Sequence, residues 1–281
     1  NPSSPFIYGL YRIFQGRLIN ATINGSICKG RPVTLNKSSQ LSWWQKKKRS
    51  IIKRLLIRFV NSSDSYVIQH LPEILSDTNI KFSQLRESWI YQNEDNNNKD
   101  LVRLLFLITT VEELKKSNIQ GALAELGVYR GNSAKILHSL CPERDLYLFD
   151  TFTGFDEKDC EPEKESAGGF SNTSLEQVQN FVGKKDTIHY FQGYFPETTH
   201  QLDPNIRYAL VHLDADLYKP TKSGLEYFYD KLVPGGVLIL HDYNNSRWPG
   251  VAMAVKEFFG DKPEMPIVIP DKSGSGLIRK V

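Results

Sequence analysis

Glycine and carboxylate residues follow one short apolar stretch at a spacing typical of a nucleotide-type cofactor site. The stretch 121–131 contains Glu125 and Gly127, and a helix is expected from Asn132 onward. Glycine lets the backbone approach a ligand, and the free N–H groups at a helix start can bind it. A second apolar stretch ends in Asp150, whose carboxylate is expected to accept hydrogen bonds from ribose hydroxyl groups.

The glycine spacing disfavours several other nucleotide ligands. Its order is Glu-x-Gly-x-x-x-Gly rather than Gly-x-Gly-x-x-Gly, and no lysine occupies the Walker position. Pyrophosphate dinucleotides and nucleoside triphosphates are therefore not expected. The pattern favours S-adenosylmethionine, which has a ribose and an amino acid tail but no phosphate. On spacing alone, an ordinary glycine-marked turn remains the alternative.

Acidic and imidazole side chains follow two later apolar stretches. Asp214 and Asp216 come after the first, and His241 and Asp242 come after the second. In a parallel sheet, the ends of adjacent strands would bring Asp214 close to His241 and Asp242. Ligands so arranged can hold a divalent cation such as Mg²⁺, which would orient and acidify a hydroxyl group. For Asp216 we favour a simpler role as the cap of the following helix.

The elements that must position these residues alternate regularly from residue 121 onward. We expect strands over 121–127, 145–150, 187–191, 207–213 and 236–241, and helices over 131–140, 174–183, 221–231 and 251–259. Several of these strands are apolar throughout, as expected of parallel strands covered on both faces. Repeating units of this kind make a doubly wound α/β sheet. Before them, the polar tract 92–99 predicts a loop, and Asp100 is expected to cap a helix.

Two parts are expected along the chain of 281 residues. Residues 1–84 predict a helical or irregular extension, and residues 85–281 predict the α/β domain. Within the extension, residues 41–60 carry seven basic side chains and no acid. Apolar side chains recur on one helical face of this segment, at Ile52, Leu55, Leu56 and Phe59. We favour a basic amphipathic helix that docks on its own domain or a second subunit; peripheral contact with anionic lipid or an acidic glycan is the alternative.

Composition limits the class of protein. The chain is 40% hydrophobic and 24% charged, as in ordinary soluble globular proteins. Its three cysteines, Cys28, Cys141 and Cys160, lie far apart, so neither a disulfide framework nor a zinc knuckle is indicated. No apolar run approaches the ~20 residues that span a bilayer. We expect a cytoplasmic protein, a homo-oligomer, with no transmembrane segment and no nucleic-acid partner.

Four motifs occur together and in order: 125–131, 149–155, 214–218 and 234–243. The set resembles the macrocin/mycinamicin-type family of S-adenosylmethionine-dependent O-methyltransferases, which methylate sugar hydroxyl groups. The similarity covers roughly residues 85–281. It implies a class I methyltransferase fold, a Rossmann-like and mostly parallel seven-stranded sheet with helices on both faces. The final hairpin, with an antiparallel last strand, is expected from the tail 267–280.

The resemblance also implies a set of site residues. Cofactor-binding residues for S-adenosylmethionine would be Glu125, Gly127, Gly131, Ser133, Asp150 and Thr151. Ligands for Mg²⁺ would be Asp214, His241 and Asp242, with Asp214 also a catalytic base. The sequence departs from the family at His241, where the usual residue is a second aspartate. Because imidazole is a poorer Mg²⁺ ligand than carboxylate, His241 is either a ligand or a catalytic base without metal.

The predicted function is transfer of a methyl group from S-adenosylmethionine to a hydroxyl of a sugar, glycoside or polysaccharide. The alternative is a catalytically impaired cofactor-binding accessory protein of a glycan or natural-product pathway. The polar segment 156–173 is too long for a tight turn after a strand. It predicts a lid over the acceptor, with an irregular insertion as the alternative.

Overall fold

The structure, a computed structural model, describes residues 47–48, 50–52, 54–55, 70–160, 165 and 168–281. The chain divides into two compact units, residues 1–69 and residues 70–281. In the first unit, the described residues are helical and exposed, as predicted for part of the basic segment. The rest of the predicted helix near 41–60 lies outside the described residues.

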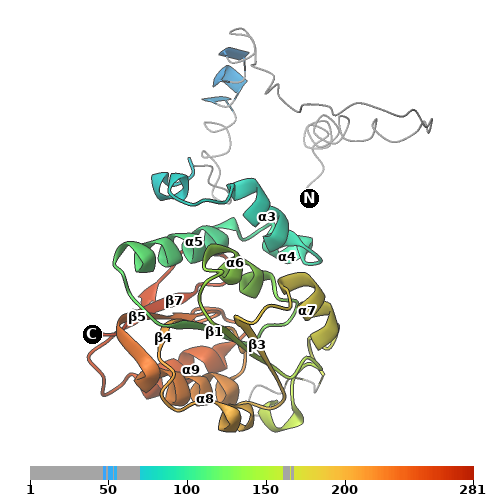
Figure 1. Cartoon of the computed structure of the whole chain (residues 1–281), viewed down its shortest axis with the longest axis vertical. Helices are drawn as coiled ribbons and strands as arrows, with labels where there is room; N and C mark the ends of the chain where they lie inside the picture. Colours follow the sequence, from blue (N-terminus) through green and yellow to red (C-terminus); the bar gives the residue numbers. More distant parts are fainter. Residues whose placement is uncertain (1–46, 49, 53, 56–69, 161–164, 166–167) are drawn as a thin grey trace, which may run out of the picture. The chain divides into compact units, whose positions relative to one another are not determined.

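A mostly parallel sheet lies at the centre of the second unit (Figure 1). Among the residues described there, seven strands pair in the order β3-β2-β1-β4-β5-β7-β6. Strands β1 to β5 run parallel, and β7 runs antiparallel to both β5 and β6. Their bounds are β1 Ala122–Leu126, β2 Leu146–Asp150, β3 Ile188–Gln192, β4 Tyr208–Leu213, β5 Leu232–Leu240, β6 Ile267–Val268 and β7 Gly276–Arg279. The predicted parallel sheet and its antiparallel final hairpin are therefore confirmed.

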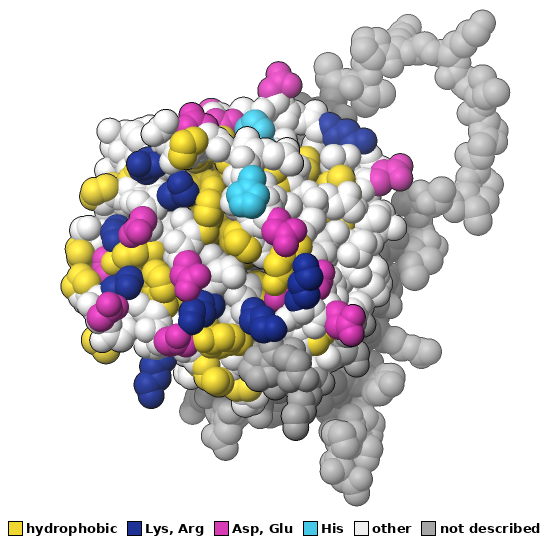
Figure 2. Space-filling model, turned by 90° about the horizontal axis from the view of Figure 1, so that it is seen from below, with side chains coloured by type: hydrophobic (Ala, Val, Ile, Leu, Met, Phe, Trp, Pro, Cys, Tyr) yellow, Lys and Arg dark blue, Asp and Glu magenta, His cyan; other side chains and the backbone are white. Residues whose placement is uncertain are grey.

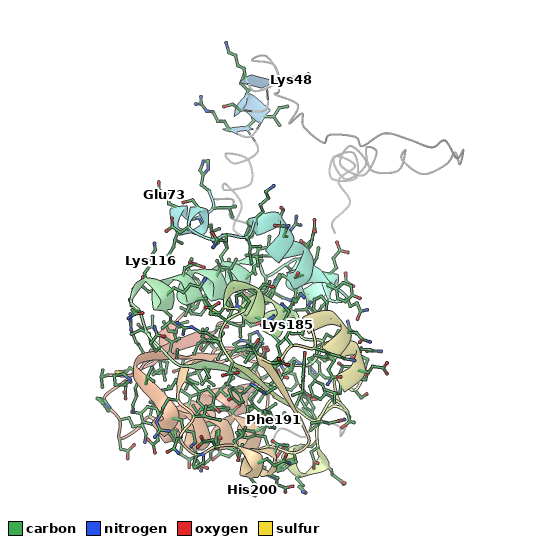
Figure 3. The ribbon with its side chains drawn as sticks, in the orientation of Figure 1. Lys48, Glu73, Lys116, Lys185, Phe191 and His200 are labelled. Carbon is green, nitrogen blue, oxygen red and sulfur yellow. The ribbon has the colours of Figure 1, made fainter. Side chains whose placement is uncertain are left out.

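Helices cover both faces of this sheet, with α5 and α6 on one side and α8 and α9 on the other (Figure 1). The helical elements are η1 Glu73–Ser76, α3 Phe82–Ile90, α4 Glu94–Asn97, α5 Leu101–Lys116, α6 Asn132–Leu140, η2 Glu157–Asp159, α7 Leu175–Val182, η3 Glu197–Gln201, α8 Tyr218–Phe228, η4 Tyr229–Lys231 and α9 Pro249–Phe258. Side chains fill the layers between helices and sheet (Figure 3).

Successive side chains along each strand point to opposite faces of the sheet, so a hydrophobic core forms on each face. In β2, Leu148 packs in the core under α5 and α6, whereas Phe149 packs in the core under α8 and α9. All six residues of β4 are buried, as expected for a central parallel strand. Burial on both faces fixes the register of these strands, so their ends, and the side chains that follow them, have defined positions.

The starts of two elements differ most from the prediction. Helix α8 begins at Tyr218 rather than at residue 221, and β5 begins at Leu232 rather than at 236. The strand runs through a glycine pair, where a Cβ on Gly236 would lie 2.8 Å from the carbonyl oxygen of Val233. Polar Lys219 and Pro220 follow Tyr218 at the start of α8, and Pro234 and the glycine pair interrupt the apolar run of β5, so neither start has a continuous apolar pattern.

The polar tract 92–99 contains the short helix α4 and is not only a loop. Asn97 is buried, and its side-chain Nδ2 donates to the carbonyl oxygen of Trp89 at 2.7 Å. The Trp89 indole donates in return to the carbonyl oxygen of Asn97 at 2.9 Å. The carboxylate of Asp100 then accepts from the backbone N–H of Arg103 at 3.3 Å and caps α5, as predicted. The two bonds between Trp89 and Asn97 hold the segment before α5 against α3.

The boundary predicted at residue 84 falls inside α3. Leu85 and Trp89 of this helix are buried in the core of the second unit, with Phe82 packed against it. The helix therefore belongs to the α/β unit, and the predicted bounds 1–84 and 85–281 remain approximate predictions. Removal of residues before 85 would break α3 apart.

The surface of the second unit mixes both signs of charge. On the face seen in Figure 2, lysine and arginine side chains are interspersed with aspartate and glutamate. The described residues of this face therefore form no continuous basic surface of the kind that nucleic acids require. No helix among the described residues is long and apolar enough to cross a bilayer.

Candidate active site

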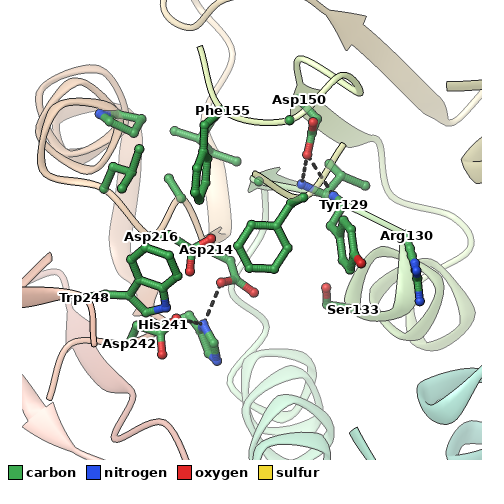
Figure 4. A pocket seen from close by; sticks show the side chains of 18 of the residues that line it. Tyr129, Arg130, Ser133, Asp150, Phe155, Asp214, Asp216, His241, Asp242 and Trp248 are labelled. Atoms are coloured by element: carbon green, nitrogen blue, oxygen red, sulfur yellow. Dashed lines mark hydrogen bonds and ion pairs between the residues drawn. The ribbon is translucent and has the colours of Figure 1, made fainter. Parts of the chain in front are cut away.

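A cavity of about 300 Å³ opens at the carboxyl ends of the parallel strands, where open α/β sheets bind ligands (Figure 4). It has one wall from the loop after β1 and the end of β2, and an opposite wall from the ends of β4 and β5. Residues predicted from the sequence to line these walls, and found there, are Gly127, Ser133, Asp150, Thr151, Asp214, His241 and Asp242.

Glu125 closes β1 behind the first wall. The Ser133 hydroxyl donates to its Oε1, and Nδ1 of His212 lies 2.8 Å from the same oxygen. Glu125 and His212 are fully buried, and Ser133 is buried at the start of α6. The other carboxylate oxygen, Oε2, has no hydrogen-bond partner among the described residues. Glu125 thus orients Ser133 from behind the wall and does not itself line the cavity.

Glycine is needed at two positions of the loop, for a different structural reason at each. Gly127 has a φ of 87°, and a Cβ there would collide with the carbonyl oxygen of Asp214. It therefore allows the loop after β1 to approach the end of β4. Gly131 has a φ of 79° as the N-cap of α6, and a Cβ there would lie 2.7 Å from Val182 of α7. Gly131 is not among the described residues that line the cavity, so its cofactor contact stays a prediction.

Asp150 braces the loop after β1. Its Oδ2 accepts backbone hydrogen bonds from Val128 at 2.7 Å and Tyr129 at 2.8 Å (Figure 4). Its Oδ1 accepts one from the backbone N–H of Phe152 at 2.6 Å. Burial raises the pKa of this carboxyl group above its ordinary value, against the effect of these bonds. The predicted ribose contact is untested, whereas the three backbone bonds give Asp150 a positioning role.

Four side chains converge on the opposite wall. Ligand atoms of Asp214, Asp216, His241 and Asp242 all lie within 4.8 Å of one another. Nδ1 of His241 is 2.6 Å from Oδ1 of Asp214 and 2.7 Å from Oδ2 of Asp242. The strand ends thus bring together the three predicted residues, together with one that we had assigned elsewhere. We refer to these four residues as the acidic cluster.

Asp216 corrects one expectation. It does not cap α8, because the N-cap of that helix is Leu217, with no side-chain capping bond. Asp216 has a φ of 59°, a left-handed conformation that aspartate tolerates better than most residues. That turn directs its side chain to the acidic cluster. The Asp-x-Asp spacing after β4 was the available signal, and the helix-cap interpretation hid it.

Opposing charges set the protonation of the acidic cluster. Burial raises the pKa of Asp214, but the neighbouring His241 and Arg103 outweigh it and hold that pKa below its ordinary value. Burial and the charges of Asp214 and Asp242 raise the pKa of Asp216. Burial and Arg103 lower the pKa of His241, but the carboxylates of Asp214 and Asp242 outweigh both and raise it to about 10.

Arg103 of α5 is a residue that the sequence analysis missed. Its Nη1 contacts Nε2 of His241 and lies 3.5 Å from Oδ2 of Asp214. A hydrogen bond from Arg103 requires an unprotonated Nε2, so this contact favours neutral His241 while the carboxylates favour the protonated ring. Its guanidinium group also lies 4.7 Å from the centroid of the Trp89 ring. No motif marks Arg103, because its partners in the acidic cluster lie more than a hundred residues away in the chain.

Aromatic side chains form another part of the lining. Phe155 lies 5.8 Å from Trp248 and 5.3 Å from Phe170 between ring centroids, and Phe170 lies 5.2 Å from Tyr129. All four line the cavity. Flat apolar faces beside carboxylates suit a ligand with both C–H and hydroxyl groups. Phe155 and Gly169 also join the ends of the predicted lid, since the Phe155 N–H donates to the Gly169 carbonyl oxygen at 2.9 Å.

Comparison with known proteins gives one family. The family model of macrocin O-methyltransferases matches residues 101–269. The 8-demethyl-8-(2,3-dimethoxy-alpha-L-rhamnosyl)-tetracenomycin-C 4'-O-methyltransferase of Streptomyces olivaceus is 31% identical over 159 residues, covering 51% of this chain and 60% of that protein. Mycinamicin III 3''-O-methyltransferase of Micromonospora griseorubida is 27% identical over 159 residues, covering 50% and 62%. The chain thus matches about 60% of the length of these curated relatives.

Solved structures show the same fold. The O-methyltransferase NovP aligns with a TM-score of 0.56 and 23% identity, over 64% of this chain and 80% of NovP. The calicheamicin methyltransferase CalS11 aligns with a TM-score of 0.52 and 21% identity, over 77% of this chain and 99% of CalS11. Together with the strand order, these likenesses show the class I methyltransferase fold.

Proposed function

The chain belongs to the macrocin O-methyltransferase family, and from that premise we propose that it methylates a hydroxyl group of a sugar, glycoside or polysaccharide with S-adenosylmethionine. One observation carries the proposal: the loop after β1 and the acidic cluster face each other across a single cavity. A methyl donor on one wall would meet an acceptor beside a base on the other. The rhamnosyl substrate named for the Streptomyces olivaceus relative supports a sugar acceptor.

The first wall has features that suit the cofactor. Gly127 would lie along the methionine end of S-adenosylmethionine, with Glu125 directly behind it and Oε2 of Glu125 without a hydrogen-bond partner among the described residues. The start of α6, with Gly131 and Ser133, would contribute N–H and hydroxyl groups. Asp150 and the adjacent Thr151 would lie at the ribose. S-adenosylmethionine, when bound, supplies a methyl group already activated on a sulfonium, so proximity and orientation account for most of the rate.

Asp214 and His241 would then act as the base. Asp214 would take the proton of the acceptor hydroxyl as the oxygen attacks the methyl carbon, and His241 would do so only where it has lost its own proton, since its pKa is raised to about 10. The new carbon–oxygen bond forms as the carbon–sulfur bond breaks, which leaves a methyl ether, S-adenosylhomocysteine and a protonated base. The 2.6 Å contact between Nδ1 of His241 and Oδ1 of Asp214 lets the proton be shared by the pair. Phe155 and Trp248 would exclude water and orient the sugar ring.

A divalent cation at the acidic cluster is the second part of the proposal. Three carboxylates and one imidazole within 4.8 Å are a donor set that fits Mg²⁺ or Mn²⁺. Such a cation, when bound, would lower the pKa of a coordinated hydroxyl group. Asp214, Asp242 and His241 would hold it, with Asp216 as a fourth ligand.

Mass spectrometry after incubation with S-adenosylmethionine and a panel of rhamnosides and other glycosides tests the transferase. We expect one acceptor to gain a methyl group in place of a hydrogen, with loss of the product in Asp214→Asn. Activity should disappear with a chelator, return with Mg²⁺ or Mn²⁺, and improve in Mg²⁺ in His241→Asp, which restores an oxygen ligand. Tight cofactor binding without turnover on any acceptor would instead favour the accessory protein.

Three further parts of the proposal concern the whole protein. A cytoplasmic location, assembly as a homo-oligomer, and docking of the basic helix near 41–60 on protein rather than membrane are predictions from the sequence. Sedimentation of the full chain would measure its oligomeric state directly.

A further inference from the structure

A cation of the protein itself already lies at the acidic cluster. The guanidinium of Arg103 reaches it from α5 and contacts Nε2 of His241, whereas Asp214 and Asp242 lie at Nδ1 of the same ring. Its Nη1 is 3.5 Å from Oδ2 of Asp214, and its side chain is only 12% exposed. A positive charge is therefore buried within reach of the same carboxylate that the proposed divalent cation would use.

Few hydrogen bonds hold this guanidinium in place. Its Nε is buried without a hydrogen-bond partner among the described residues, and lies 4.0 Å from Oδ2 of Asp100. The Trp89 ring packs against it at 4.7 Å. A guanidinium has five N–H donors, and most of those of Arg103 are not paired with side chains of the cluster. Apart from the contact with Nε2 of His241, the guanidinium is held by charge attraction to Asp214 and Asp100 and by packing on Trp89, and none of these attractions requires a single fixed geometry.

We propose that Arg103 occupies the cation's place beside Asp214 when no metal is bound, and that it competes with the divalent cation for the acidic cluster. This inference rests on the cation part of the proposed function. Both cations are attracted by the same carboxylates, and they repel each other at a separation of a few ångströms. Arg103 balances buried carboxylates that would otherwise be costly in the ion-free protein. It also weakens metal binding, so that the cation binds reversibly.

Binding of Mn²⁺ to the purified full chain, followed by electron paramagnetic resonance of the free ion, tests the competition. Arg103→Gln removes the charge and keeps a side chain that can hydrogen-bond. We expect it to bind Mn²⁺ at least about tenfold more tightly than the parent, the effect of removing a charge a few ångströms from the ion. Arg103→Lys keeps the charge and should bind Mn²⁺ much more like the parent.

A matched control comes from the same cavity. Arg130 also lines it, but its guanidinium lies 5.0 Å from the Tyr129 ring and bonds to the carbonyl oxygen of Gln92, away from the acidic cluster. Arg130→Gln removes one charge from the cavity and should leave Mn²⁺ affinity within about twofold of the parent. An equal gain in both glutamine variants would show a general charge effect and overturn the competition.

Unchanged or weaker Mn²⁺ binding in Arg103→Gln would also overturn the proposal. If this variant folds only in the presence of Mn²⁺, the ion replaces the lost charge and the proposal is supported; failure to fold with and without Mn²⁺ overturns it. Absence of Mn²⁺ binding in every variant removes both the competition and the cation part of the proposed function. Calorimetry with S-adenosylhomocysteine on the same samples tests the transferase part separately.

Discussion

Asp150→Ala separates two roles of one carboxylate, a ribose contact and the bracing of the loop after β1. In the structure, Asp150 accepts three backbone hydrogen bonds, two of them from Val128 and Tyr129 of that loop. Tyr129 has a φ of 52°, so this loop includes a residue in a conformation that few side chains adopt without support. Truncation of Asp150 should therefore lower the free energy of unfolding of the cofactor-free protein.

The magnitude follows from these bonds. A hydrogen bond to a charged group contributes about 1.5–3 kcal/mol, but neighbouring bonds are not additive. We expect a loss of roughly 2–4 kcal/mol in the free energy of unfolding, less than the sum of three bonds. If Asp150 also binds the ribose, the affinity for S-adenosylmethionine should fall by about 10- to 150-fold beyond any effect of the loop.

Urea unfolding of the cofactor-free protein and calorimetry with S-adenosylhomocysteine measure the two effects separately. Asp203→Ala is a matched control, because Asp203 accepts one backbone hydrogen bond, from Asn205 at 2.8 Å, in an exposed turn. Asp203→Ala should lower the free energy of unfolding by less than about 1 kcal/mol. A cofactor-free Asp150→Ala protein as stable as the Asp203→Ala protein would refute the bracing argument. Unchanged ligand affinity in a folded variant would remove Asp150 from the ribose site.

Three further outcomes are expected. His212→Leu leaves the fully buried Glu125 without its imidazole partner and should lower the free energy of unfolding by about 3–5 kcal/mol in urea titrations; a loss below 1 kcal/mol would show that the pair is unimportant. The pKa of His241 is raised to about 10, so the stability that this proton contributes should be complete below its unperturbed pKa of about 6.5 and disappear as the pH rises through 10. The difference in unfolding free energy between the parent and His241→Asn should shrink over that range without metal, and growth would contradict the assignment. Glutamine at Lys46, Lys47 and Lys48 should leave liposome sedimentation unchanged, whereas salt-sensitive binding lost in that variant would favour membrane contact.

The sheet and the strand-end motifs could be predicted because their signals are local in the sequence. Apolar runs define each strand, and Asp214, His241 and Asp242 follow strand ends directly. Parallel pairing of β4 with β5 then places these ends side by side, with Leu213 opposite Leu240. A residue whose position is set by a strand end needs no further information once the strand order is known.

Arg103 and Asp216 could not be assigned in the same way. Arg103 lies in a helix near a polar tract, and its place at the site depends on the Trp89–Asn97 bonds that set the start of α5. Its partner His241 is 138 residues away. Asp216 depends on one left-handed residue, which turns the side chain toward the site instead of onto α8. Neither a long-range contact nor a single backbone angle has a periodic signal.

Two residues of this chain make the acidic cluster less negative: His241, where the family has an aspartate, and Arg103. Imidazole in place of a carboxylate removes negative charge from the acidic cluster, and Arg103 adds positive charge beside it. Nδ1 of His241 lies 2.6 and 2.7 Å from two carboxylate oxygens, and these charges favour a proton on that nitrogen, whereas a metal ligand requires a lone pair there. The same imidazole therefore cannot share a proton with Asp214 and bind a cation through Nδ1 at once. Binding of a divalent cation through Nδ1 must release a proton from the cluster, so the cation and the Asp214–His241 base are alternative states of one site.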